Sequence, residues 1–386
     1  MARVPNPYRP GFNQTPTALA GREGVLAAFR EALDVAALDA RTPRPLLLTG
    51  GRGVGKTVVM GEAAVMAATD YGWLTVPVEV RPRSSFTPQL VERLSIARDL
   101  YAQAPAGRDV EVVSTKVRAA VLGLGAEVEL RRRTHPASTT AGELDAALAG
   151  AVEAAEAHSA GLVVTLDEIH LAERAELADL AATLQQRVPD GWPLVVVMAG
   201  LPSMREPRRA VTYLERGEWH VLGPLDPAAS RTALERPAIA AGRPLSAAAA
   251  DLLVDASGGY PYAIQVLGHH AWRTSAHSDG IDVRHARAAV AAGQRDLEAG
   301  LYAVRWQDAS PREREYLLAL AKLSSEDVDA TSAGVARRLG RAPSDVSYLR
   351  DRLVKKGTLF ADGRRLHFPT PGMAEWIVRT ADNEDQ

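Results

Sequence analysis

The chain has 386 residues, of which 46% are hydrophobic and 24% charged, a balance typical of globular proteins with two or three domains. Its formal net charge is −2, so the whole protein is no polycation and any nucleic-acid surface must be local. Cysteine is absent, which excludes disulfides, thiol nucleophiles and cysteine zinc sites. The N-terminus has no apolar signal-peptide core and no uncharged run approaches membrane-spanning length, so we expect a cytoplasmic protein with no membrane partner.

The first part of the chain leads to a glycine-rich motif. Residues 1–18 are rich in proline, asparagine, glycine and threonine and are expected to form an extended arm. An amphipathic helix and an apolar strand follow, and the strand ends in G-x-x-x-x-G-K-[ST] at residues 50–57. We expect a nucleotide phosphate to be bound here, by Gly50, Gly51, Arg52, Gly53, Val54, Gly55, Lys56, Thr57 and Val58.

Two residues of this motif have side-chain roles. Lys56 is expected to reach the β- and γ-phosphates, and the Thr57 hydroxyl to ligate Mg²⁺. Only five of the 45 basic residues are lysine, yet lysine occupies position 56, where a slim point charge suits phosphates better than a guanidinium. The motif therefore predicts ATP and Mg²⁺ as cofactors.

A second apolar strand, residues 161–166, ends in Asp167-Glu168. We expect this strand to lie beside the phosphate-loop strand, with Asp167 on Mg²⁺ and Glu168 polarising the attacking water. His170 either approaches the γ-phosphate or lies at the surface at a helix start. The next strand, residues 193–199, ends without a polar residue before Ser203, which argues against fast hydrolysis.

The pattern of strands and helices predicts the domain organisation. Alternating strands and helices over residues 19–223 predict an α/β P-loop NTPase domain with a three-layer parallel sheet. Residues 224–304 show only helical patterns and are expected to form an all-α lid. Residues 105–138 are the least readable part, with short strands possible at 111–113 and 126–130.

Residues 305–380 are expected to form a third domain, followed by a tail at 381–386. A capping box opens it at Ser310, two further helices follow, and strands at 358–360 and 366–368 flank an Asp-Gly turn. This order predicts a winged helix-turn-helix. Residues 306–380 contain 13 Lys and Arg against ten Asp and Glu, a mild excess. Candidate DNA contacts on the second helix and the wing are Ser347, Arg350, Arg352, Lys355, Arg364 and Arg365.

Together, these motifs resemble the AAA+ ATPases, in particular the origin-recognition and replication-initiator clade, and the related STAND signalling ATPases. The resemblance covers nearly the whole chain, with Ala20-Gly21-Arg22-Glu23 similar to the motif on the adenine side and Asn6-Pro7-Tyr8-Arg9-Pro10-Gly11 similar to the start of actinobacterial AAA-family proteins. It implies that the base lies between the Arg22 region and the lid, where Pro261 of Gly259-Tyr260-Pro261 packs on adenine. The other interpretation of this stretch is a helix break followed by a helix-starting proline.

The resemblance also implies an arginine supplied by a neighbouring subunit. Candidates are Arg205, Arg208, Arg209 and Arg216, with Arg216 the first choice as a catalytic residue beside Lys56 and Glu168. Our leading hypothesis is an ATP-dependent DNA-binding ATPase that forms a nucleotide-dependent homo-oligomer. The alternative is a STAND-like regulatory switch whose winged helix docks a partner protein, and a motor acting on polypeptide is a third option.

Overall fold

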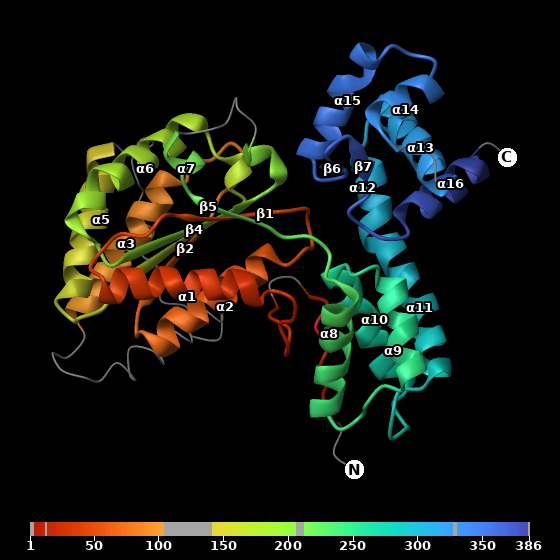
Figure 1. Cartoon of the computed structure of the whole chain (residues 1–386), viewed down its shortest axis with the longest axis horizontal. Coiled ribbons are helices and arrows are strands. Elements are labelled where there is room, and N and C mark those ends of the chain that lie inside the picture. The colour runs from red at the N-terminus through yellow and green to blue at the C-terminus, as the bar shows by residue number, and fades with distance from the viewer. Residues whose placement is uncertain (1–3, 12–13, 104–140, 206–211, 327–329, 385–386) are drawn as a thin grey trace. The chain divides into compact units, whose positions relative to one another are not determined.

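The computed structural model describes residues 4–11, 14–103, 141–205, 212–326 and 330–384. The chain divides into two compact units (Figure 1). We call Arg22–Thr49 with Lys56–Val221 the sheet unit, and Met1–Gly21 with Gly50–Gly55 and Leu222–Gln386 the helical unit.

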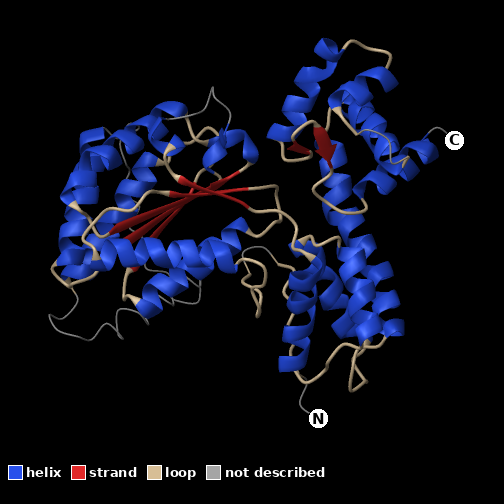
Figure 2. Cartoon of the chain, in the orientation of Figure 1, coloured by secondary structure: helices blue, strands red, loops and turns tan. Residues whose placement is uncertain are grey.

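The sheet unit is built on five parallel strands in the order β2-β3-β4-β1-β5. Their bounds are β1 (Leu46–Thr49), β2 (Leu74–Glu79), β3 (Leu162–Asp167), β4 (Leu194–Gly200) and β5 (Glu218–Val221). The central strands are apolar on both faces because helices cover both sides of the sheet (Figure 2). The predicted three-layer α/β arrangement is therefore confirmed for this unit.

One expectation about the sheet is wrong. β3 does not lie beside β1, because β4 is inserted between them: Leu46 of β1 pairs with Val197 of β4, and Val164 of β3 pairs with Val196 on the other side. Adjacency of strands is a tertiary property that the apolar pattern of each strand leaves open, since both strands are buried on two faces and either can sit in the middle.

Helices of the sheet unit pack on the strands through leucine and alanine spaced three or four residues apart. Leu90 and Leu94 of one helix and Leu144 and Leu148 of another are fully buried. The helices are α1 (Glu23–Leu38), α2 (Lys56–Asp70), α3 (Thr87–Ala102), α5 (Ala141–Glu156), α6 (Arg174–Arg187) and α7 (Thr212–Glu215), with 3-10 turns η1 (Ile169–Leu171), η2 (Val188–Asp190) and η3 (Pro202–Arg205). The strands considered at 111–113 and 126–130 lie outside the described residues.

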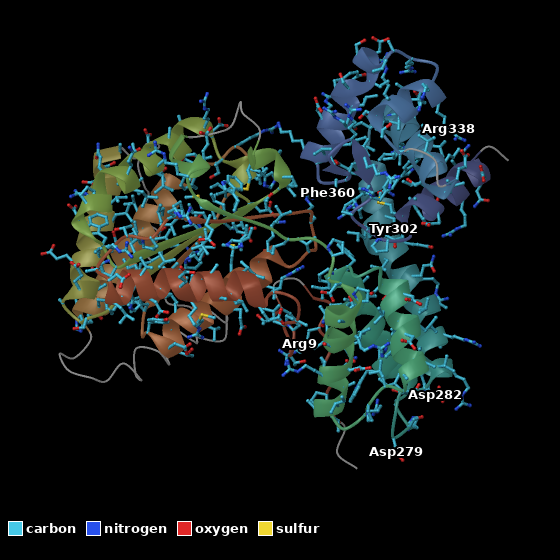
Figure 3. The ribbon with its side chains drawn as sticks, viewed as in Figure 1. Arg9, Asp279, Asp282, Tyr302, Arg338 and Phe360 are labelled. Atoms are coloured by element: carbon cyan, nitrogen blue, oxygen red, sulfur yellow. The ribbon has the colours of Figure 1, made fainter. Side chains whose placement is uncertain are left out.

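In the helical unit, the residues expected to form the lid contain helices joined by loops, with one isolated bridge between Leu245 and Ile281. The elements are α8 (Pro227–Ala240), α9 (Ala247–Ser257), α10 (Pro261–Thr274), α11 (Val283–Leu297), the π-helical turn η4 (Glu298–Tyr302) and α12 (Ala303–Asp308). Asp282, marked in Figure 3, caps α11 by accepting from the backbone N–H groups of Arg284 and His285. The run from α11 to α12 is helical without a loop. The boundary expected after residue 304 therefore falls inside a helix.

Part of the N-terminal arm packs against these helices. Tyr8 is 2% exposed, and its hydroxyl donates to the carbonyl of Leu234 in α8. The Tyr8 ring occupies the space beside Gly268, where a Cβ would collide with it. Arg9 follows at the surface, with its N–H on the Gln265 side chain (Figure 3). The described part of residues 1–18 contains no helix or strand, and one buried aromatic ring packs it on α8 and α10.

The last part of the helical unit contains α13 (Pro311–Ser325), α14 (Ser332–Arg338), α15 (Pro343–Lys355), β6 (Phe360–Asp362), β7 (Arg365–His367) and α16 (Met373–Glu384). The capping box at Ser310 is present, and Thr331 caps α14 through the N–H of Gly334. β6 and β7 pair as a hairpin, although both strands differ by up to two residues from the bounds expected for them. In the described part of the chain, no helix is long and apolar enough to cross a membrane.

Candidate active site

The glycine-rich motif forms the turn between β1 and α2. Gly53 and Gly55 have φ angles of +78° and +95°, the left-handed region in which an L side chain is strained. Lys56 is the first residue of α2 and its side chain is 6% exposed. Because the first N–H groups of a helix have no partner within the helix, this turn presents donors suited to a phosphate.

Thr57 and Asp167 meet at the carboxyl end of the sheet. The Thr57 hydroxyl, in the first turn of α2, donates to Asp167 Oδ2 over 2.6 Å, and the other oxygen, Oδ1, accepts from the Glu168 N–H over 2.8 Å. The two residues are 110 positions apart in the chain, and α2 contacts β3 directly. The predicted pair of metal ligands is thus brought together even though β3 is not the neighbour of β1.

The same pair fits Mg²⁺ by its chemistry. Both atoms are oxygens, the donors that Mg²⁺ prefers, and octahedral coordination holds neighbouring oxygens about 2.9 Å apart. The Thr57 and Asp167 oxygens need to separate only slightly from 2.6 Å to take two such positions. Among the described residues, no group of three or more His, Cys, Asp or Glu side chains is placed to hold a metal ion.

Glu168 adopts a left-handed backbone conformation, with φ +55° and ψ 31°, immediately after β3. Non-glycine residues in this region are uncommon and gather at functional sites. Its carboxylate Oε2 lies 3.2 Å from His170 Nδ1. The His170 side chain is 3% exposed, so the alternative that placed this histidine at the surface is wrong.

His170 also connects two strand ends. Its Nδ1 lies 3.4 Å from the backbone N of Leu201, which directly follows β4. The imidazole therefore lies between the Glu168 carboxylate and the loop after β4. Sequence reasoning left this role open because a histidine two residues after a carboxylate gives no signal of its own; only the turn η1 folds it back.

The end of β4 has the apolar character that the sequence predicts. All seven residues of β4 are buried, and the first hydroxyl after it belongs to Ser203, which is 2% exposed. The Ser203 Oγ has no hydrogen-bond partner among the described atoms. Burying a hydroxyl without a hydrogen-bond partner destabilises the folded protein, so this side chain could gain a partner if a bound ligand changed the loop.

The remaining predicted site residues occupy varied positions. Arg22 precedes α1 and is 9% exposed, and burial lowers the pKa of its guanidinium. Pro261 is the first residue of α10, and Arg216 is exposed in the turn before β5. Arg208 and Arg209 lie outside the described residues.

The DNA-binding candidates lie on α15 and the hairpin. Val346, Leu349 and Leu353 form the buried side of α15. Arg352 and Lys355 are exposed, as are Arg364 and Arg365 on the hairpin. The other two candidates, Ser347 and Arg350, interact with residues of α15 itself. Ser347 donates to the Ser344 carbonyl over 3.1 Å, and Arg350 pairs with Asp351 at 2.7 Å.

Comparisons with known proteins were made on sequence and on structure. Residues 18–197 match the family model of the AAA ATPase domain, and residues 299–377 match a domain of unknown function. A search among curated protein sequences found no match. The chain is similar in structure to a Walker-type ATPase of Pyrococcus abyssi, with a TM-score of 0.55 at 16% identity over 94% of this chain and 96% of that one.

Two further solved structures resemble the chain more loosely. Cdc6p of Pyrobaculum aerophilum gives a TM-score of 0.47 at 15% identity over 97% of both chains. The Orc1 protein of Aeropyrum pernix, solved in complex with DNA, gives 0.46 at 19% identity over 96% of this chain and 94% of that one.

The domain match includes Lys56, Thr57, Asp167 and Glu168, which the geometry above singles out. The likeness to the Pyrococcus protein supports the same P-loop NTPase fold. Residues 18–197 thus match the AAA ATPase domain and carry β1, β2, β3 and most of β4 of the parallel sheet, and the protein is an ATPase.

Proposed function

We propose that the protein binds ATP with Mg²⁺, hydrolyses it slowly, and uses its nucleotide state to control the binding of duplex DNA by a C-terminal winged helix. The hydrogen bond between Thr57 and Asp167 carries the nucleotide part of this proposal, because it joins the end of the phosphate loop to the carboxylate at the end of β3. Mg²⁺, when bound there, would neutralise phosphate charge.

In this proposal, different residues bind ATP, activate water and complete the site. Lys56 binds the phosphates, and Glu168 orients the attacking water and accepts its proton. His170 positions the Glu168 carboxylate from 3.2 Å. Turnover is slow because β4 ends without a polar side chain that contacts the γ-phosphate, and Arg216, exposed before β5, completes the site of a neighbouring copy.

We further propose five parts for the chain: an arm at 1–18, the ATPase domain at 19–223, the lid at 224–304, the winged helix at 305–380 and a tail at 381–386. The lid and the winged helix join within the continuous helical run from α11 to α12. Movement of one is then transmitted to the other without a flexible linker.

The order α13, α14, α15 and hairpin supports the winged helix. Arg352 and Lys355 on α15, together with Arg364 and Arg365 on the hairpin, supply the exposed positive charge for phosphate contacts. The chain would read DNA mainly through these cations, with α15 directed toward the major groove.

A second candidate function has one observation in its favour. Arg350 is paired with Asp351, and the adjacent Tyr348 is 40% exposed, so part of the exposed side of α15 is neutral and aromatic. Such a face suits a protein partner better than a phosphate backbone. In this reading, the C-terminal part docks protein and the nucleotide state controls assembly.

A measurement of duplex DNA binding distinguishes the DNA-binding function from the protein-docking function. Anisotropy of a labelled duplex is measured at salt concentrations from about 50 to about 200 mM, with and without Mg-ATP, and phosphate contacts make log K fall by about 0.9 per contact against log salt. Arg352→Ala combined with Lys355→Ala is expected to weaken binding and reduce this slope. Arg236→Ala with Arg284→Ala, two exposed arginines of α8 and α11, is the matched control. Absence of salt-dependent binding would refute the DNA proposal and favour protein docking.

A further inference from the structure

The phosphate loop is contacted by a tyrosine from outside the ATPase domain match. Tyr260 precedes α10, is 1% exposed, and donates its hydroxyl to the backbone carbonyl of Arg52 over 2.8 Å. The same hydroxyl lies beside Gly53, where a Cβ would collide with it. Gly53 is therefore required twice, by its positive φ and by the approach of Tyr260.

Tyr260 is itself held by residues of the C-terminal segment, defined here as the matched residues 299–377. The Arg305 guanidinium, on α12, donates a hydrogen bond to the Thr370 hydroxyl and lies close enough to Tyr260 to interact electrostatically with its hydroxyl. Thr370 is 1% exposed. Arg305 Nη2 is buried and has no hydrogen-bond partner among the described atoms, so the guanidinium has one further N–H donor that can form a hydrogen bond here.

A second contact reaches the loop from the same segment. A Cβ on Gly51 would lie 3.3 Å from the Cβ of Pro369, the residue before Thr370. Pro371, the residue after it, accepts a hydrogen bond from the Tyr302 hydroxyl. The short stretch 369–371 thus contacts both the phosphate loop and the helix that carries Arg305.

The helix that carries Arg305 has an unusual turn just before it. Residues Glu298–Tyr302 form the π-helical turn η4, a feature that is rare and occurs mostly at functional sites. Figure 3 marks Tyr302 at this turn. Glu298, the first residue of the turn, pairs with Arg379 of α16 at 2.7 Å, and Tyr302, its last residue, donates to the Pro371 carbonyl.

We propose that Tyr260, Arg305 and Thr370 form a relay that positions the phosphate loop, so that the C-terminal segment sets the affinity of the loop for nucleotide. The inference rests on the proposed nucleotide binding at this loop. Tyr260 holds the Arg52 carbonyl and so fixes the path of the loop backbone, on which phosphate binding by successive N–H groups depends. Because coupling is reciprocal, bound nucleotide also stabilises the arrangement of the segment, which gives a route from the ATPase domain to the C-terminal helices.

The test removes single polar atoms while preserving shape. Tyr260→Phe deletes the hydroxyl that bonds Arg52, and Thr370→Val deletes the oxygen that bonds Arg305. One such hydrogen bond contributes about 0.5–1.5 kcal/mol, so each variant should weaken Mg-ADP binding by about twofold to tenfold. The double variant should lose less than the sum, because both changes break one relay. Tyr262→Phe, two residues on and 37% exposed, is the matched control and should bind as wild type.

Hydrogen exchange of the nucleotide-free protein gives an independent readout. Both variants should raise the exchange rate of amides in residues 51–57, and Tyr262→Phe should leave it unchanged. Unchanged exchange and unchanged Mg-ADP affinity in Tyr260→Phe would overturn the relay, and full additivity of the two variants would overturn its extension to Thr370. If wild type bound no Mg-ADP, the proposed function would fail, whereas the exchange rates would still decide whether the relay positions the loop.

Discussion

Substitution of Asp167 by asparagine tests the metal site without changing the shape of the residue. In the structure, Oδ2 accepts from Thr57 over 2.6 Å and Oδ1 accepts from the Glu168 N–H over 2.8 Å. Asparagine offers only one acceptor oxygen and no charge. The Coulomb attraction between a unit charge and a divalent cation about 4 Å away is about 8 kcal/mol at an effective dielectric of about 20. Hydration of the separated carboxylate and cation offsets most of this attraction. We therefore expect Mg²⁺-dependent nucleotide affinity to fall at least about tenfold, or about 1.4 kcal/mol.

The assay is titration of a fluorescent ATP analogue with Mg²⁺ and again with EDTA. Wild type should bind more tightly with Mg²⁺, and Asp167→Asn should lose most of that difference while its EDTA affinity changes little. Asp179→Asn, an exposed carboxylate of α6, is the matched control. If Asp167→Asn kept the full Mg²⁺ dependence, the pairing of Thr57 with Asp167 would not be a metal site and the reasoning would be refuted.

Three further outcomes follow from other contacts. Glu168→Gln should keep Mg-ATP affinity and stop turnover in a phosphate-release assay; normal hydrolysis would show that Glu168 is not the base. His170→Gln should lower turnover about tenfold or more at unchanged Mg-ATP affinity, and an unaltered rate would remove its positioning role. Burial opposes ionisation of Glu313, but hydrogen bonds from Ser310 and Lys356 outweigh it and hold its pKa below the usual 4.5. Its stabilising contribution is then present above about pH 4.5 and lost as the pH falls through the folded pKa. Glu313→Gln should cost about 1–3 kcal/mol in urea unfolding at pH 7 and progressively less below pH 4.5, whereas Glu315→Gln, an exposed neighbour, should cost under about 0.5 kcal/mol. A loss from Glu313→Gln that is independent of pH would contradict the sign argued here.

The nucleotide motifs were predictable because their chemistry is local in sequence. Gly53, Gly55, Lys56 and Thr57 lie within five consecutive residues, so their spacing alone specifies a phosphate loop. Asp167 was predictable because it follows a wholly apolar run, and parallel strands place their carboxyl ends at one edge of the sheet. The helical character of residues 227–300 was likewise readable from its periodicity.

Other features depend on contacts between distant residues, which a single sequence does not reveal. The insertion of β4 between β1 and β3 changes no residue type within any strand. The sequence places Tyr260 in a glycine-proline turn. Its hydrogen bond to Arg52 joins residues 208 positions apart, so the local pattern does not predict it. Arg350 reads as a DNA contact because its own helix offers an exposed side, yet the ion pair with Asp351 engages its guanidinium.

The central claim is that the loop at residues 50–57 binds nucleotide and that the ATPase activity depends on it. Calorimetric titration of Mg-ATP into wild type and Lys56→Ala tests this most directly, with Lys322→Ala of α13 as the control for loss of a lysine. Wild type and Lys322→Ala should each bind one nucleotide per chain, and Lys56→Ala should show none at the same concentrations. Equal binding by wild type and Lys56→Ala would contradict the account.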